Sequence, residues 1–261
     1  MQNKLSAHIG YLFNELPLKE RAAAAAATGF TAVEHPQPFA IDPDVMRKTI
    51  NDCGLVFAQL AGGAGDASKG EKGLASLPGR ESDFRSSFDR ALEYAQIVGA
   101  PLLHPMAGVP GEVNADRAQD MYLKNIRYAV ERTAGTGVKV LIEAISEAAV
   151  PGYAISTLKK AMEVQDIFGS GKVALLIDTF HAAVTEVELT TWIPSNGERI
   201  GHVHIADFPG RHEPGTGTLA FEDILVALAA VNFKGAIGFE YVPSKSTVES
   251  AFFLQEWKRR L

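Results

Sequence analysis

Four short apolar segments of this chain each end on a residue that can bind a divalent metal ion. The four residues are Glu143, Asp178, His204 and Glu240. A charged side chain at the end of an apolar, β-branched segment is costly to bury unless something pairs with it. If the segments are neighbouring parallel strands, all four side chains face one cavity. We therefore predict a site of three carboxylates and one imidazole.

This donor set favours Mg²⁺ or Mn²⁺, with Co²⁺ or Zn²⁺ as alternatives, over a structural zinc site. Any one of the four residues could instead be an ordinary polar side chain at an open strand end. Four of them in successive predicted strands favour a metal site.

Two histidines lie close to these residues in the sequence. His181 follows Asp178 in a D-x-x-H spacing, which places it on the loop just past the strand. There it reaches a substrate oxygen or simply faces solvent. His202 precedes His204 by two residues, so both face the same side of a strand. His202 either orients a metal ligand by hydrogen bonding or is a buried core histidine.

The segment from Asp207 to Gly217 contains two prolines and three glycines, which is typical of a tightly turned loop. It would present Arg211 to the cavity, where the planar guanidinium could bind a carboxylate or vicinal hydroxyls. The alternative is a salt bridge from Arg211 to Glu213 or Asp207. Weaker candidates for contacts with a substrate end or flank other apolar segments: His8, Glu34, His35, Gln59 and His104.

Two glutamates at one metal site suggest acid–base chemistry on a small substrate. A metal that chelates a hydroxyl and a neighbouring carbonyl acidifies the C–H bond between them and stabilises an enediolate. Glu143 or Glu240 removes that proton, and a group across the plane returns one. Return to the adjacent carbon interconverts aldose and ketose, whereas return to the same carbon epimerises. Loss of a β-hydroxyl would give a dehydratase instead.

Apolar segments alternate with helical patterns along the whole chain. The predicted strands are Leu5–Ile9, Ala32–Glu34, Val56–Leu60, Leu102–His104, Val138–Glu143, Val173–Asp178, Ile200–Ile205 and Ala236–Glu240. The predicted helices are Pro17–Thr28, Pro43–Cys53, Glu81–Val98, Asn114–Gly135, Ile155–Phe168 and Phe221–Val231.

Eight strands alternating with helices in a chain of 261 residues predict an α/β fold, the (β/α)₈ TIM barrel, as a single domain spanning residues 1–261. A doubly wound sheet is the main alternative, but no G-x-G-x-x-G follows the first strand. The glycine-rich stretch Ala61–Arg80 is too long for an ordinary loop and is predicted to lie over the barrel mouth.

The composition limits the partners. A formal net charge of −6 and a pI near 5.7 argue against nucleic-acid binding through a broad basic face. Cys53 is the only cysteine, so no disulfide forms within the chain, and we predict a cytoplasmic protein. No apolar stretch is long enough to span a membrane. The sequence leaves a homo-oligomer open, since Phe252–Leu254 with Trp257 packs the final helix on the barrel or forms a dimer contact.

The chain resembles the hydroxypyruvate isomerase family, within the xylose-isomerase-like TIM barrels. The resemblance runs nearly end to end, and its most specific motif is Pro209-Gly-Arg-His-Glu-Pro-Gly-Thr-Gly217. It implies a metal-assisted isomerase of a small hydroxy-carbonyl acid, such as hydroxypyruvate or a 2-oxo-tetronate. It also implies Glu143 and Glu240 as the catalytic pair, with Asp178 as a further metal ligand.

One ligand position departs from that family. Where the family usually carries Gln, this chain has His204, which is similar to the ligand of ketose 3-epimerases in the same superfamily. A ketose 3-epimerase is therefore the nearest alternative. The superfamily also includes apurinic endonucleases, which need three zinc ions and more histidines than the seven present here.

Overall fold

The computed structural model describes residues 3–260, in which nine parallel strands form one sheet with the order β3-β2-β1-β9-β8-β7-β6-β5-β4. The strands are β1 (Leu5–His8), β2 (Ala32–Glu34), β3 (Val56–Phe57), β4 (Gln59–Gly62), β5 (Leu102–Pro105), β6 (Lys139–Glu143), β7 (Val173–Asp178), β8 (Ile200–Ile205) and β9 (Ile237–Phe239). The predicted fold class is confirmed: this is a TIM barrel.

The barrel closes through one interrupted strand. β3 pairs with β2 and β4 pairs with β5, while only Ala58 separates β3 from β4. The predicted single strand Val56–Leu60 is therefore wrong. The strand is interrupted at Ala58, because its first part pairs with β2 and its second part with β5. Together, β3 and β4 occupy the place of the third of the eight strands in the barrel.

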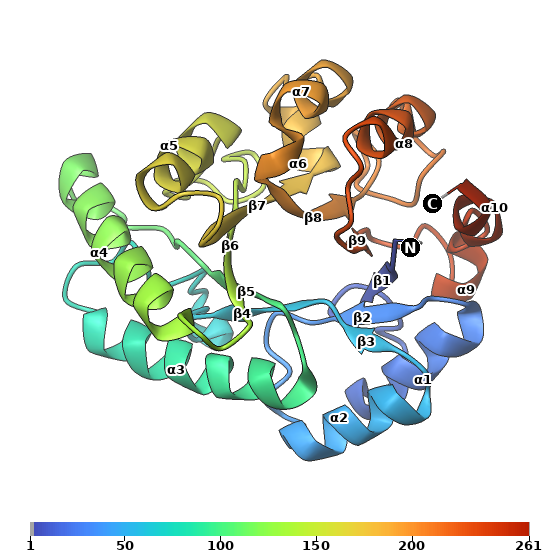
Figure 1. Ribbon diagram of the computed structural model, residues 1–261, viewed down its shortest axis with the longest axis horizontal. Coiled ribbons are helices and arrows are strands. Elements are labelled where there is room, and N and C mark those ends of the chain that lie inside the picture. The colour runs from blue at the N-terminus through green and yellow to red at the C-terminus, as the bar shows by residue number, and fades with distance from the viewer. Residues whose placement is uncertain (1–2, 261) are drawn as a thin grey trace.

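Helices surround the strands on the outside (Figure 1). They are α1 (Leu18–Thr28), α2 (Pro43–Asp52), α3 (Glu81–Val98), α4 (Ala115–Thr133), α5 (Leu158–Phe168), α6 (Thr179–Val184), α7 (Leu189–Asn196), α8 (Phe221–Ala230), α9 (Thr247–Ser250) and α10 (Leu254–Arg260), with short 3₁₀ turns at Ala67–Lys69 and Gly197–Arg199. Within residues 3–260 no helix is long and apolar enough to cross a membrane.

Local sequence signals explain several helix boundaries. α2 begins after Asp42, whose side chain accepts hydrogen bonds from the backbone N–H groups of Asp44 and Val45. α3 ends at Gly99, which adopts the left-handed conformation that favours glycine. The structure adds α6 and α7 between β7 and β8, where no helix was predicted. They have six and eight residues, too few for a helical period to show in the sequence.

The side chains inside the barrel change from apolar to polar along the barrel axis. Near the amino-terminal ends of the strands it is filled by an apolar cluster of Leu102, Leu141, Ala174 and Leu176. Because alternate residues of a strand face the same side, Glu143 lies above Leu141. Polar side chains therefore gather at the carboxyl-terminal end, where active sites of TIM barrels lie.

The glycine-rich stretch after β4 packs beside the loop that follows β5, at the same end of the barrel. Gly73 forms an isolated bridge with Ala107, and the Ser76 hydroxyl donates to the Ala107 carbonyl (2.8 Å). Asn125 of α4 donates to the Ala75 carbonyl (2.9 Å) and is buried. The stretch is thus held in place by buried hydrogen bonds.

The carboxyl-terminal aromatic residues close the last helix on the barrel. The Phe253 ring lies 4.9 Å from the Phe239 ring of β9, and the Trp257 ring lies 5.4 Å from it. Phe252 is 65% exposed, whereas Phe253 is 5% exposed. The packing interpretation of this segment therefore holds for Phe253 and Trp257.

These neighbours give a matched pair of substitutions. Phe253→Ala should lower the free energy of unfolding by about 3–5 kcal/mol, because it leaves a cavity among aromatic rings. Phe252→Ala should change it by no more than about 0.5 kcal/mol in the monomer. Denaturant titration measures both. If both substitutions lowered the free energy of unfolding equally, the exposed ring of Phe252 would also be packed.

Candidate metal centre and active site

The structure brings the four predicted ligands together at the carboxyl-terminal end of the barrel. Glu143 ends β6, Asp178 ends β7, His204 lies in β8 and Glu240 directly follows β9. Each offers one donor atom, and these four atoms lie within 4.8 Å of one another. Residues that are up to about 100 positions apart in the sequence therefore face one small volume.

The donor atoms fit a divalent cation. Asp178 Oδ2 and His204 Nδ1 are buried and have no hydrogen-bond partner within residues 3–260. Buried polar atoms without a partner are rare in folded proteins, because leaving them unpaired is costly. Oxygen donors with one imidazole are ligands that Mg²⁺ or Mn²⁺ accepts. A cation here would satisfy both atoms.

Asp178 is oriented by the helix that follows it. Its Oδ1 accepts a hydrogen bond from the backbone N–H of His181 (3.0 Å), so Asp178 caps α6. The second oxygen is thereby left for the cluster. Nη2 of Arg211 lies 3.7 Å from this second oxygen.

The two glutamates differ in their electrostatic surroundings. Burial, with the added repulsion of Glu240, raises the pKa of Glu143 to about 8. Burial also opposes ionisation of Glu240, but His8, His204 and Arg211 outweigh it and lower the pKa of Glu240 to about 2. One carboxyl group therefore holds a proton at neutral pH while the other is ionised, the division that acid–base pairs use.

Arg211 lies at the accessible side of the cluster. Its guanidinium forms an ion pair with Glu240 and lies 5.2 Å from the ring centroids of both Tyr11 and Phe180. The side chains of Arg211 and Glu240 are 18% and 13% exposed, whereas Asp178 is completely buried. A substrate therefore meets Arg211 and Glu240 first.

The loop that carries Arg211 is held by Asp207. The Asp207 carboxylate accepts hydrogen bonds from the backbone N–H groups of Phe208, Gly215, Gly217 and Leu219, at 2.9, 2.9, 2.8 and 3.1 Å. A Cβ at position 217 would overlap the Phe208 carbonyl, so glycine is required there. Glu213 accepts hydrogen bonds from Ser244. Neither Asp207 nor Glu213 pairs with the Arg211 guanidinium, unlike the alternative prediction.

The remaining predicted substrate residues lie at different depths. His181 lies in the first turn of α6 rather than on a loop, because the helix begins directly after Asp178. Its Nδ1 is 3.0 Å from the Ser146 hydroxyl. His104 Nδ1 is 3.6 Å from Glu143 Oε2, so it borders the cluster. Gln59 is two residues before the level of His104 and therefore deeper in the barrel.

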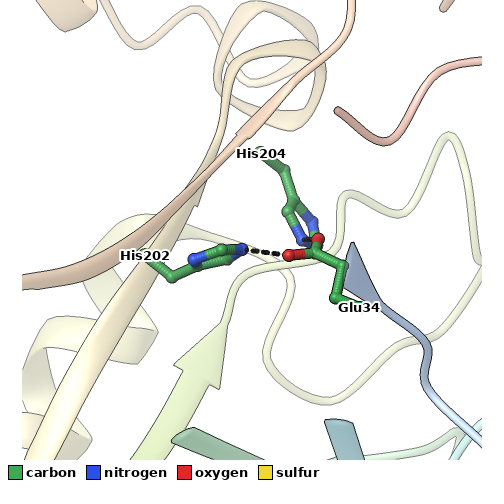
Figure 2. Close-up of side chains that lie close together, drawn as sticks. All are labelled: Glu34, His202 and His204. Atoms are coloured by element: carbon green, nitrogen blue, oxygen red, sulfur yellow. Dashed lines mark hydrogen bonds and ion pairs between the residues drawn. The ribbon is translucent and has the colours of Figure 1, made fainter. Parts of the chain in front are cut away.

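Two further residues belong to the site. His8 Nε2 lies 3.2 Å from Glu240 Oε1. Glu34, at the end of β2, lies with Oε1 at 2.7 Å from His204 Nε2 (Figure 2). Burial lowers the pKa of His204, but Glu34 and Glu240 outweigh that effect and raise it to about 10. Both residues end apolar strands, but the sequence indicates no partner for either.

Comparison with known proteins gives nearly full-length similarities. The model of a family described as xylose isomerase-like TIM barrel matches residues 22–257. A 2-oxo-tetronate isomerase of Pectobacterium atrosepticum is 34% identical over 256 residues, covering 97% of each chain. The hydroxypyruvate isomerase of Escherichia coli is 29% identical over 245 residues, covering 94% of this chain and 95% of the relative.

Solved structures show the same architecture. A structure from Brucella melitensis, described as an AP endonuclease of family 2, has a TM-score of 0.94 at 31% identity and covers 97% of this chain and 98% of its own. D-psicose 3-epimerase from Clostridium cellulolyticum H10 has a TM-score of 0.78 at 17% identity, with 98% and 95% coverage. At that identity, the likeness to the epimerase shows the fold alone.

The Asp207 contacts predict how the Arg211 loop responds to substitution. Asp207→Ala removes the acceptor for four backbone N–H groups, so the free energy of unfolding should fall by at least about 2 kcal/mol. Amide exchange at Gly215 and Gly217 should become faster. Asp207→Asn keeps one acceptor oxygen and should be intermediate, and Asp223→Ala, on exposed α8 surface, should change neither quantity. Unchanged exchange in Asp207→Ala would refute this role.

Proposed function

The chain belongs to the xylose isomerase-like TIM barrel family and is an isomerase, and we propose that it interconverts the aldehyde and ketone forms of a small hydroxy-carbonyl acid. The family resemblance seen in the sequence is thereby confirmed. The relatives named above act on 2-oxo-tetronate and hydroxypyruvate. We propose substrates of the same class for this chain, a small-molecule partner rather than nucleic acid or membrane, and a cytoplasmic location.

The observation that supports this proposal most strongly is the convergence of four donor atoms at the carboxyl-terminal end of the barrel. Glu143, Asp178, His204 and Glu240 would hold one divalent cation, with Mg²⁺ or Mn²⁺ preferred. A cation bound there supplies polarisation of the substrate carbonyl, which acidifies the neighbouring C–H bond.

The two glutamates would carry the protons. Glu240 is ionised and lies on the accessible side, so we assign it removal of the proton from the carbon next to the carbonyl. Burial raises the pKa of Glu143 in the chain without a cation, so we assign to it protonation of the adjacent carbon, while the hydroxyl proton passes to the former carbonyl oxygen. The transfer between neighbouring carbons distinguishes isomerisation from epimerisation.

Arg211 would select an acidic substrate. Its planar guanidinium can bind a carboxylate with two parallel hydrogen bonds, and the rings of Tyr11 and Phe180 hold it in place. When a substrate binds, its carboxylate would replace part of the contact between Arg211 and Glu240. His104, Gln59 and His181 remain predicted contacts for the substrate.

The ketose 3-epimerase alternative rests on His204, with Asp178 and His181 in D-x-x-H spacing. A panel of hydroxy-carbonyl acids and free ketoses of three to six carbons, incubated in D₂O with Mn²⁺, separates the two activities. The proposal predicts aldose–ketose exchange of an acid with solvent deuterium in the product. An epimerised ketose, or a product lighter by one water, would favour the epimerase or a dehydratase respectively.

Removal of the metal tests the cofactor directly. Dialysis against a chelator should abolish turnover, and Mn²⁺ or Mg²⁺ should restore it, because carbonyl polarisation is lost and regained. Full turnover in protein shown by elemental analysis to hold no divalent metal would exclude this mechanism.

Substitution of the two glutamates tests the proton transfers. Glu143→Gln and Glu240→Gln should each lower kcat by about 10²–10⁴ with metal present at saturating concentration. Exposed Glu147, four residues after Glu143, provides the control, and Glu147→Gln should leave kcat unchanged. If both variants still incorporated solvent deuterium into the product at the wild-type rate, neither glutamate would carry a proton in the reaction.

Substitution of Arg211 tests whether the substrate is an acid. Arg211→Ala should lower kcat/KM for a carboxylate substrate roughly 10- to 100-fold more than for a neutral sugar of equal length, since only the acid loses a charged hydrogen bond. Arg211→Lys keeps the charge but loses the fork and should be intermediate. Equal losses on both substrates would show that Arg211 does not recognise the acid.

A further inference from the structure

A second polar cluster lies directly beside the four candidate ligands. It consists of Glu34, His202 and His204, which are 0%, 0% and 2% exposed (Figure 2). An ionised carboxylate sealed from water is costly unless it is hydrogen-bonded. The fold places this one where its only close polar partners given by the structure for residues 3–260 are two imidazoles.

His204 takes part in both clusters through its two ring nitrogens. Its Nε2 is 2.7 Å from Glu34 Oε1, while its Nδ1 is 3.7 Å from Glu240 Oε2 and 3.9 Å from Glu143 Oε1. A carboxylate only accepts hydrogen bonds, so Nε2 must carry the hydrogen. In a neutral ring the lone pair is then on Nδ1, which faces the candidate metal position.

Glu34 is itself held from two sides. His202, two residues before His204 on β8, lies with Nε2 at 2.9 Å from Glu34 Oε2, an ion-pair distance without aligned hydrogen-bond geometry. On another side, the backbone of β9 leaves room only for glycine. A Cβ at Gly238 would overlap Glu34 Oε1 and lie 2.8 Å from His202 Nε2. The carboxylate therefore has little freedom to turn away from His204.

We propose that Glu34 is a positioning residue for the metal centre. It fixes the His204 ring with Nδ1 directed at Glu143 and Glu240, and His202 keeps the Glu34 carboxylate in place. The inference rests on the proposed function, because it requires a cation among the four candidate ligands. It adds that the affinity for this cation depends on a residue that is not one of them.

Mn²⁺ affinity, measured by calorimetry on the full chain without substrate, tests this role. Glu34→Leu keeps the volume but removes the acceptor, so the dissociation constant should rise about 10- to 100-fold. Glu34→Gln retains an oxygen that accepts from Nε2–H and should recover most of the affinity. Unfolding midpoints are measured in parallel, since a purely structural role would not produce recovery by Gln at equal stability.

Two glycines provide a matched pair of substitutions outside the candidate ligands. Gly238→Ala inserts a methyl group that would overlap Glu34 Oε1 and lie 2.8 Å from His204 Cδ2, so it crowds both sides of the contact between Glu34 and His204 and should weaken Mn²⁺ binding. Gly201→Ala crowds Ala174, whose Cβ would be 2.6 Å away, at the opposite end of the barrel interior. It should leave the Mn²⁺ affinity unchanged. Equal effects of the two substitutions would contradict the proposal.

A spectroscopic measurement decides the case where Glu34→Leu does not fold. In ¹⁵N-histidine-labelled wild-type protein with Mg²⁺, the His204 ring should carry hydrogen on Nε2 and none on Nδ1. Hydrogen on Nδ1 would overturn the proposal.

The remaining outcomes separate this inference from the proposed function. One Mn²⁺ per chain with unchanged affinity in folded Glu34→Leu would overturn the positioning role alone. Two Mn²⁺ per chain, reduced to one in Glu34→Leu, would also overturn it, because Glu34 would then be a ligand. No Mn²⁺ binding by the wild-type chain would overturn both.

Discussion

The repulsion between buried carboxylates is the constraint on which this structure depends. Glu143, Asp178 and Glu240 contribute oxygens to one small volume, and each unpaired charge held away from water would cost several kcal/mol. Arg211 and His204 lie among them and offset part of the charge. A divalent cation offsets more, which is why the same arrangement that opposes folding favours metal binding.

The surrounding fold orients these groups. Parallel strands deliver their last residues to one end of the barrel, and α6 fixes one oxygen of Asp178 while leaving the other for the cluster. Asp207 accepts hydrogen bonds from the backbone of the loop that carries Arg211. The accessible groups are then a proton acceptor and a guanidinium, which suit a small acid that can lose a proton next to its carbonyl.

The sequence predicted the barrel and the convergence of four strand ends, because apolar periodicity and polar residues at strand ends are local signals. It did not predict partners: Glu34 meets His204 across 170 positions, and Arg211 pairs with Glu240 rather than with neighbouring Glu213. Such pairs depend on how the strands close into the barrel. The break at Ala58 was missed for a similar reason, since pairing with β2 and with β5 determines it. The helix α6 was missed because six residues are too few for a helical period to show.

The position of the cation is the central claim, and anomalous scattering measures it most directly. A crystal of the wild-type chain grown with Mn²⁺ should give one anomalous peak within coordination distance of Glu143, Asp178, His204 Nδ1 and Glu240. Electron density for a fully ordered cluster without such a peak would contradict the account. A peak between Glu34 and His202 instead would contradict it equally.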